Sequence, residues 1–126
     1  MITVGKTAAV KTTVDKNNTA RAIDSGSLDV FATPMMIALM ESAACEALSD
    51  ALEAGQTSVG TQISVSHTAA APLGSTITAA ATVTNVSGRK IEFAVTASDD
   101  AGEIGNGTHV RFIVDKTKFM AKMNER

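Results

Sequence analysis

One long helix is predicted by the stretch Thr33-Pro34-Met35-Met36-Ile37-Ala38-Leu39-Met40-Glu41-Ser42-Ala43-Ala44-Cys45-Glu46-Ala47-Leu48-Ser49-Asp50-Ala51-Leu52-Glu53. Thr33 is a suitable N-cap, because its hydroxyl can accept a hydrogen bond from a free backbone N–H. Pro34 fits the first helical position, where its missing N–H costs nothing. Gly55 is expected to close the helix, which therefore runs from about residue 34 to residue 54.

Glu41 does not lie on the polar face of this predicted helix. At about 100° per residue, the polar face is formed by Ser42, Glu46, Ser49, Asp50 and Glu53. The residues that project with Glu41 are small or apolar: Ile37, Ala38, Cys45, Leu48 and Leu52. A carboxylate on the core-facing side of a helix is costly to bury. Glu41 is therefore expected either to carry chemistry or to pair with a strand cation such as Arg111.

Strands are predicted on both sides of the helix. Residues 8–14 alternate loosely and are followed by the turn-forming run Asp15-Lys16-Asn17-Asn18. Four runs rich in Thr, Val, Ile and Ala follow the helix, and they are Val59–Thr68, Thr76–Val86, Ile91–Ser98 and Gly105–Val114. The short breaks between these runs predict antiparallel neighbours. The charged tail, residues 116–126, predicts only a short turn of helix or a frayed end.

The order of these elements predicts an α+β fold. A helix that is apolar over more than half of its circumference needs a sheet wrapped around it. This combination favours the hotdog architecture, a bent antiparallel sheet around one long central helix, as a single domain over residues 1–126. The sheet would have open edges, which dimerisation could pair and cover.

Composition excludes several classes of protein. The net charge of −2, with no Trp or Tyr to stack on a base, argues against binding of nucleic acid. No signal peptide and no apolar run long enough to span a bilayer are present, so a soluble cytoplasmic protein is expected, with no membrane partner. The single cysteine, Cys45, predicts a small buried thiol in a reducing compartment rather than a disulfide.

His67 and Thr33 are the other candidates for chemistry. His67 ends a strand on the same side as Val59, Thr61, Ile63 and Val65, which is the apolar side. An imidazole there is either a satisfied structural group or a general base suited to physiological pH. Besides capping the helix, Thr33 lies where the free N–H groups of the helix start could hold a carboxylate or an oxyanion.

Other kinds of site are disfavoured. The chain lacks the Gly-x-Ser-x-Gly turn of one hydrolase class, and its glycine-rich segment 102–107 precedes a strand rather than a helix, unlike a phosphate-binding loop. His67 and His109 form no His-x-x-x-His pair, so no metal or bound cofactor is expected. Arg111 faces away from the side of Val110 and Phe112, which predicts a solvent-facing or interface residue.

The sequence resembles a known family at these positions. The segment from Phe31 to Glu41, which contains Ala-Thr-Pro, together with Val59-Gly60-Thr61 and Ser66-His67, resembles the fluoroacetyl-CoA thioesterase-like branch of the hotdog superfamily. The resemblance implies that Thr33, Glu41 and His67 form a catalytic set, and that Gly60 and Arg111 contact the substrate. It also implies a homodimer that binds acyl-CoA across the subunit interface.

The favoured function is hydrolysis of a small acyl-CoA thioester to a free acid and coenzyme A. Glu41 would act as nucleophile or as base for a water, His67 as general acid and base, and Thr33 as a positioning group. One alternative is a non-catalytic module that binds acyl-CoA on the same fold, because fold does not fix function. Another is a hotdog dehydratase acting on a hydroxyacyl thioester.

Overall fold

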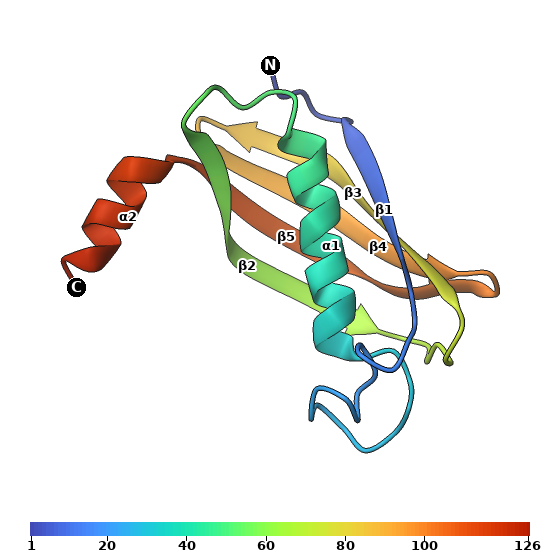
Figure 1. Cartoon of the computed structure of the whole chain (residues 1–126). Helices are drawn as coiled ribbons and strands as arrows, with labels where there is room; N and C mark the ends of the chain where they lie inside the picture. The colour runs from blue at the N-terminus through green and yellow to red at the C-terminus, as the bar shows by residue number, and fades with distance from the viewer.

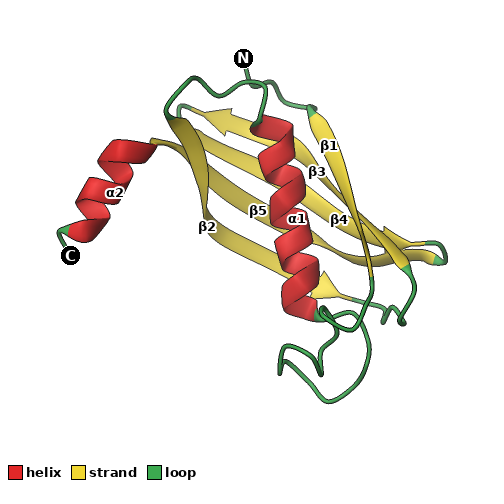
Figure 2. Cartoon of the chain, viewed as in Figure 1, coloured by secondary structure: helices red, strands yellow, loops and turns green.

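The computed structural model describes all 126 residues. Its elements, in chain order, are β1 (Thr7–Thr13), α1 (Thr33–Leu48), β2 (Gln56–His67), β3 (Thr76–Ser87), β4 (Lys90–Asp99), β5 (Gly102–Asp115) and α2 (Lys116–Asn124). The five strands form one antiparallel sheet in the order β1-β3-β4-β5-β2. The sheet curves around α1, which lies along its concave face, while α2 stands at one side (Figures 1 and 2).

The order of the strands corrects one expectation from the sequence. The break at Pro72-Leu73-Gly74 predicts that the strands before and after it are neighbours. In the structure β2 and β3 lie on opposite sides of the β4–β5 pair, and β2 pairs only with β5. The segment after His67 therefore crosses the sheet instead of making a hairpin. As a result β2 is an edge strand with one unpaired side.

Helix α1 is shorter than predicted at its C-terminal end and starts at a different cap. It ends at Leu48: Ser49 keeps helical backbone angles, but residues 49–51 continue only as a turn in which the Ala51 amide donates to the Leu48 carbonyl. Gly55, with φ of 84°, belongs to the turn that enters β2. Ala32 occupies the N-cap position and Thr33 is the first helical residue, so the predicted side-chain cap by Thr33 is wrong.

The buried face of α1 also differs from the predicted one. It consists of Met36, Met40, Ala43, Ala44, Ala47 and Leu48, which join one hydrophobic cluster with the inward residues of β3 and β4. Ala38 and Cys45 are exposed, so the prediction of a buried thiol is wrong. Glu41 lies on the flank between the two faces, with 41% of its side chain exposed. The alanine-rich sequence left the angle of the apolar face poorly defined, which explains the error.

A β-bulge interrupts β2 between Gly60 and Gln62. Simple alternation puts Gly60 on the opposite side from His67. The extra residue, Thr61, reverses the phase, so Gly60 faces α1 as Ile63, Val65 and His67 do. Because of this bulge, residues from both halves of β2 face the helix.

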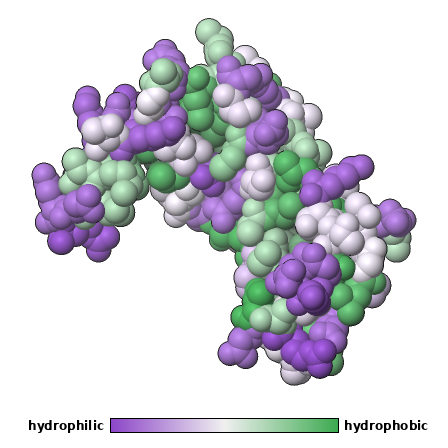
Figure 3. Space-filling view, in the orientation of Figure 1, coloured by the Kyte–Doolittle hydropathy of each residue, from purple (hydrophilic) through white to green (hydrophobic).

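The short helix α2 follows β5 directly and is held at its start by a hydrogen bond from the Lys116 amide to the Gly55 carbonyl. Asp115 caps it by accepting a hydrogen bond from the Lys118 amide. None of its residues is buried, and Figure 3 shows it projecting from the rest of the molecule with a hollow beneath it. Neither helix is long and apolar enough to cross a membrane.

Candidate active site

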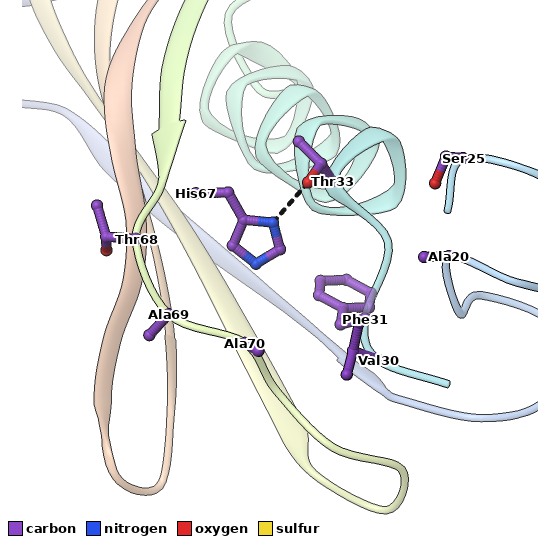
Figure 4. A pocket seen from close by; sticks show the side chains of 9 residues that line it. All are labelled: Ala20, Ser25, Val30, Phe31, Thr33, His67, Thr68, Ala69 and Ala70. Carbon is purple, nitrogen blue, oxygen red and sulfur yellow. Dashed lines mark hydrogen bonds between the residues drawn. The ribbon is translucent and has the colours of Figure 1, made fainter. Parts of the chain in front are cut away.

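Thr33 and His67 meet at the N-terminal end of α1. The Thr33 hydroxyl and the His67 Nδ1 atom are 2.7 Å apart, joined by a hydrogen bond between side chains 34 positions apart in the sequence (Figure 4). The two residues line a cavity of about 260 Å³, whose other walls are Ala20, Ser25, Val30, Phe31, Thr68, Ala69 and Ala70. Small and apolar residues thus surround one polar pair.

The second nitrogen of His67 has no partner. Its Nε2 atom is buried and makes no hydrogen bond within the chain. An unsatisfied buried polar atom costs about 1–3 kcal/mol, so such atoms are uncommon and often mark a site where a ligand or water binds. The Thr33 contact fixes the ring so that this free nitrogen is oriented by the fold.

Glu41 lies two turns further along the same helix, beside the middle of β2. Its Oε2 atom accepts a hydrogen bond of 3.2 Å from Arg111 Nη1 and lies 3.9 Å from His109 Nε2. The carboxylate borders a second cavity of about 210 Å³, lined also by Gly60, Thr61, Gln62, Ile63 and His109. Glu41 is therefore paired with Arg111, which is one of the two alternatives that the sequence left open, and its carboxylate also borders a cavity.

Arg111 occupies a different environment from the one predicted. It is 7% exposed and faces α1, whereas the sequence indicated a solvent-facing or interface residue. Arg111 does point away from the side of Val110 and Phe112, as predicted. That other side is the convex surface of the sheet, which is itself only half-buried. Strand alternation gives two sides but does not say which of them faces the core.

His109 is the residue that sequence reasoning missed. It is 2% exposed, shares the inward side of β5 with Arg111, and lies in the same cluster as Glu41. Burial lowers its pKa below the ordinary value of 6.5, and the neighbouring Arg111 charge acts in the same direction. The signal in the sequence was its spacing of two residues from Arg111, a period that places both on one side of a strand.

Gly60 provides the space for this cluster. A Cβ atom at this position would lie 2.8 Å from Glu41 Oε2, 3.1 Å from His109 Cε1 and 3.2 Å from Arg111 Nη1. A side chain here would therefore displace the carboxylate or its partners. The absence of a side chain lets the β2 backbone approach the charged groups closely.

The structure thus brings the predicted residues together as two groups. Thr33 and His67 form one, and Glu41, Gly60 and Arg111 form the other with His109. Eight residues of helix separate Thr33 from Glu41, which is about 12 Å along the helix axis. Each group contains one residue of α1 and one of β2, and the second group also draws Arg111 and His109 from β5. No cluster of three His, Cys, Asp or Glu side chains suited to a metal ion is found.

Comparison with known proteins identifies the family of the chain. The family model described as fluoroacetyl-CoA-specific thioesterase matches residues 14–117. The fluoroacetyl-CoA thioesterase of Streptantibioticus cattleyicolor is 45% identical over 98 residues, which are 78% of this chain and 70% of that protein.

Solved structures show the same fold. A structure of the fluoroacetyl-CoA thioesterase FlK superposes with a TM-score of 0.93 and 37% identity, over 100% of this chain and 98% of that one. A thioesterase superfamily member from Thermus thermophilus superposes with a TM-score of 0.91 and 28% identity, over 99% and 93% of the two chains. The predicted hotdog fold is confirmed, and the chain belongs to the fluoroacetyl-CoA-specific thioesterase family as a thioester hydrolase.

Proposed function

We propose that this protein hydrolyses a small acyl-CoA thioester to the free acid and coenzyme A, with Glu41, His67 and Thr33 as its catalytic set. The observation that carries the proposal is the pair of polar groups left open between α1 and β2. These are the Glu41 carboxylate, bordering one cavity, and the buried, unpartnered Nε2 of His67. Each is oriented by a hydrogen bond on its other side.

The cavity beside His67 supports a small acyl group. Its volume is about 260 Å³, which suits a small acyl group rather than a long chain. A variant of the FlK thioesterase, whose structure superposes with a TM-score of 0.88 and 38% identity, was solved in complex with fluoroacetate and CoA. That relative supports a short acyl group bound next to coenzyme A in this chain as well.

The proposed chemistry assigns one role to each residue. Glu41 either attacks the thioester carbonyl, forming an anhydride that water then hydrolyses, or removes a proton from a water that attacks the carbonyl. In both routes the C–S bond breaks and the departing sulfur gains a proton. With the Thr33 hydroxyl donating to Nδ1, the neutral ring of His67 carries its proton at Nε2, where it can be delivered to the sulfur.

Gly60 and Arg111 are proposed to contact the substrate in different ways. Gly60 exposes β2 backbone beside the carboxylate, where a thioester could approach closely. Arg111 already donates hydrogen bonds to Ser58, His109 and Glu41. Its contribution to the substrate is therefore a buried positive charge next to the reacting carbonyl rather than a free pair of donors.

A second copy of the chain is proposed to close the site. The outer edge of β2 is unpaired, and the flank of α1 that carries Ala38, Glu41 and Cys45 is uncovered in a single chain. Pairing of two β2 edges would cover both features. Acyl-CoA would then bind at the subunit interface, with the thioester held between the Thr33–His67 pair of one chain and Glu41 of the other.

Replacement of Glu41 tests the function. Glu41→Gln keeps the shape of the side chain but removes the nucleophile or base, so kcat for release of free thiol from acetyl-CoA and other short acyl-CoA esters should fall by about 10²–10⁴-fold or more. Glu46→Gln, an exposed change one turn away on the same helix, is the matched control and should keep the wild-type rate. Both variants should retain the fold, as measured by circular dichroism.

Two results would contradict the proposal in different ways. A Glu41→Gln variant that releases thiol at the wild-type rate would remove Glu41 from the catalytic set while leaving hydrolysis in place. Wild-type protein that binds short, medium and aromatic acyl-CoA esters but hydrolyses none of them would support the binding-module alternative, and the proposed function would be withdrawn.

A further inference from the structure

A buried histidine, His109, lies beside Arg111, the cation that contacts the proposed catalytic carboxylate. His109 and Arg111 are 2% and 7% exposed, and both project from β5 toward α1. Arg111 Nη1 lies 3.1 Å from His109 Nε2 and donates a hydrogen bond of 3.2 Å to Glu41 Oε2. One nitrogen of the guanidinium therefore contacts both His109 and Glu41.

The partners of His109 define its tautomer. Its Nδ1 atom lies 2.7 Å from the Gln62 carbonyl oxygen, which can only accept, so Nδ1 carries the proton and donates. Nε2 then has a free lone pair and accepts the hydrogen bond from Arg111 Nη1. Burial and the Arg111 charge lower the pKa of His109, which keeps the ring neutral and able to accept.

The other donors of Arg111 also have hydrogen-bond partners. Its Nε donates to the Ser58 hydroxyl at 2.8 Å, and its Nη2 donates to the Ser58 carbonyl at 3.1 Å. Ser58 holds one edge of the guanidinium plane, and His109 holds Nη1 from the other side. With both contacts in place, the N–H directed at Glu41 has one orientation.

Gly60 limits movement of the same cluster on its open side. The ideal Cβ position at Gly60 is only 2.8 Å from Glu41 Oε2 and 3.1 Å from His109 Cε1, so the β2 backbone packs directly against both groups. The carboxylate, the imidazole and the guanidinium thus form a closely packed unit, and a shift of one group displaces the others.

We infer that His109 is a positioning residue for the proposed reaction: by accepting a hydrogen bond from Arg111, it fixes the guanidinium that holds the Glu41 carboxylate at the cavity. The inference rests on the proposed function for the role of Glu41 in chemistry. His109 does not border the Thr33–His67 cavity and makes no hydrogen bond to Glu41 itself. It acts through Arg111.

A purely structural role for His109 predicts something different. The ring also stacks on Phe93, with 6.2 Å between the ring centroids, and satisfies the Gln62 carbonyl. Loss of these contacts would lower stability whichever residue replaced the histidine. Two substitutions separate the roles. His109→Asn keeps a donor near the Gln62 carbonyl but is too short to reach Arg111, whereas His109→Gln carries an acceptor at about the reach of Nε2.

The first measurement is kinetic. His109→Asn should lower kcat for acyl-CoA hydrolysis by about 10–100-fold with KM changed less than about threefold, because a misplaced carboxylate weakens chemistry more than binding. His109→Gln should recover most of kcat. In an Arg111→Met background, His109→Asn should cause no further loss of kcat, because the guanidinium through which His109 acts is already absent.

The opposite pattern overturns the inference. Equal losses of kcat in the Asn and Gln variants, or a full effect of His109→Asn in the Arg111→Met background, would show that His109 acts as core packing alone.

A second measurement does not depend on activity. Nitrogen-15 NMR should show His109 protonated at Nδ1 only, and the Arg111 Nε–H signal should exchange slowly in the wild type and the Gln variant but fast in the Asn variant. If the wild type hydrolyses no acyl-CoA, the proposed function fails, and these signals alone decide whether His109 holds Arg111. Fast exchange in the wild type would refute that role.

Discussion

At the scale of single residues, the site depends on how the charges of Glu41 and Arg111 are compensated where they are removed from water. Glu41 keeps 41% of its side chain exposed, so its charge remains partly hydrated while Arg111, 7% exposed, relies on it and on Ser58 for compensation. A buried cation without partners would be strongly unfavourable. Removal of Glu41 therefore affects Arg111 as well, and Glu41→Gln is preferable to Glu41→Ala because the amide oxygen still accepts a hydrogen bond.

The titration of His109 gives a pH-dependent contribution to stability. Burial, aided by Arg111, lowers the pKa of His109 in the folded protein, against the opposing effects of the Gln62 carbonyl and Glu41. In the unfolded chain this residue takes up a proton near its ordinary value of 6.5, while the folded protein does not. Protonation of His109 therefore does not change the folding stability above about pH 7. Below pH 6.5 the folding stability falls as the pH drops toward the lowered pKa of His109.

We expect urea unfolding to show this loss at pH 5.5 relative to pH 7.5, with a slope from this residue of at most about 1.4 kcal/mol per pH unit. His109→Gln removes the titrating group and should lose less stability over the same interval. Because the two proteins differ only at residue 109, the difference between the two slopes isolates His109. Identical slopes would contradict a lowered pKa at this position.

At the scale of elements, the pairing of β2 with β5 determines where His67 and the Glu41 cluster lie. Gly105 and Gly107 of β5 pair opposite His67 and Val65 of β2. A Cβ atom at Gly107 would lie 2.0 Å from the Ser64 carbonyl oxygen, which is a backbone atom that cannot move alone. The two strands therefore approach more closely here than any larger residue allows.

Gly107→Ala should consequently destabilise the fold by about 1–3 kcal/mol or more, because it forces the β2 and β5 backbones apart. Activity should fall further than stability alone explains, since His67 lies two residues from the displaced pair. Thr108→Ala, at the adjacent exposed position, is the control and should change stability by no more than about 0.5 kcal/mol. Denaturant unfolding and thiol-release assays measure the two effects, and a wild-type-like Gly107→Ala protein would contradict the close approach.

At the scale of the whole molecule, a single chain leaves much of its functional surface uncovered. One edge of the sheet, formed by β2, is unpaired, and α2 exposes Phe119, Met120 and Met123. Figure 3 shows the open hollow between α2 and the rest of the molecule. Exposed edges and apolar residues of this kind favour association with another surface.

We expect the protein to be a homodimer in solution. Sedimentation or light scattering should give a mass of about 26 kDa, twice the chain mass of 13.0 kDa, because two copies can cover the β2 edges and the flank of α1. The dimer should persist at the concentrations used for activity assays. A mass of 13.0 kDa for protein that is actively hydrolysing acyl-CoA would rule out a site that needs two copies.

The sequence by itself determined the kind of fold and the candidate residues. One helix with an Ala-Thr-Pro start and four alternating runs sufficed for the hotdog architecture, because period and turn residues are local properties of the chain. Thr33, Glu41, Gly60 and His67 could be proposed as site residues from their positions along the predicted elements and from the resemblance to a family, since both are sequence patterns.

Only the tertiary structure decided how those residues are grouped. The bulge at Thr61 reversed the phase of β2 and turned Gly60 toward the helix, and the crossing of the chain after His67 made β2 an edge strand. The buried state of Arg111 and the role of His109 depend on contacts between β5, β2 and α1, which lie far apart in the sequence. Alternation tells which residues share a side of a strand, but only packing determines which side becomes the interior.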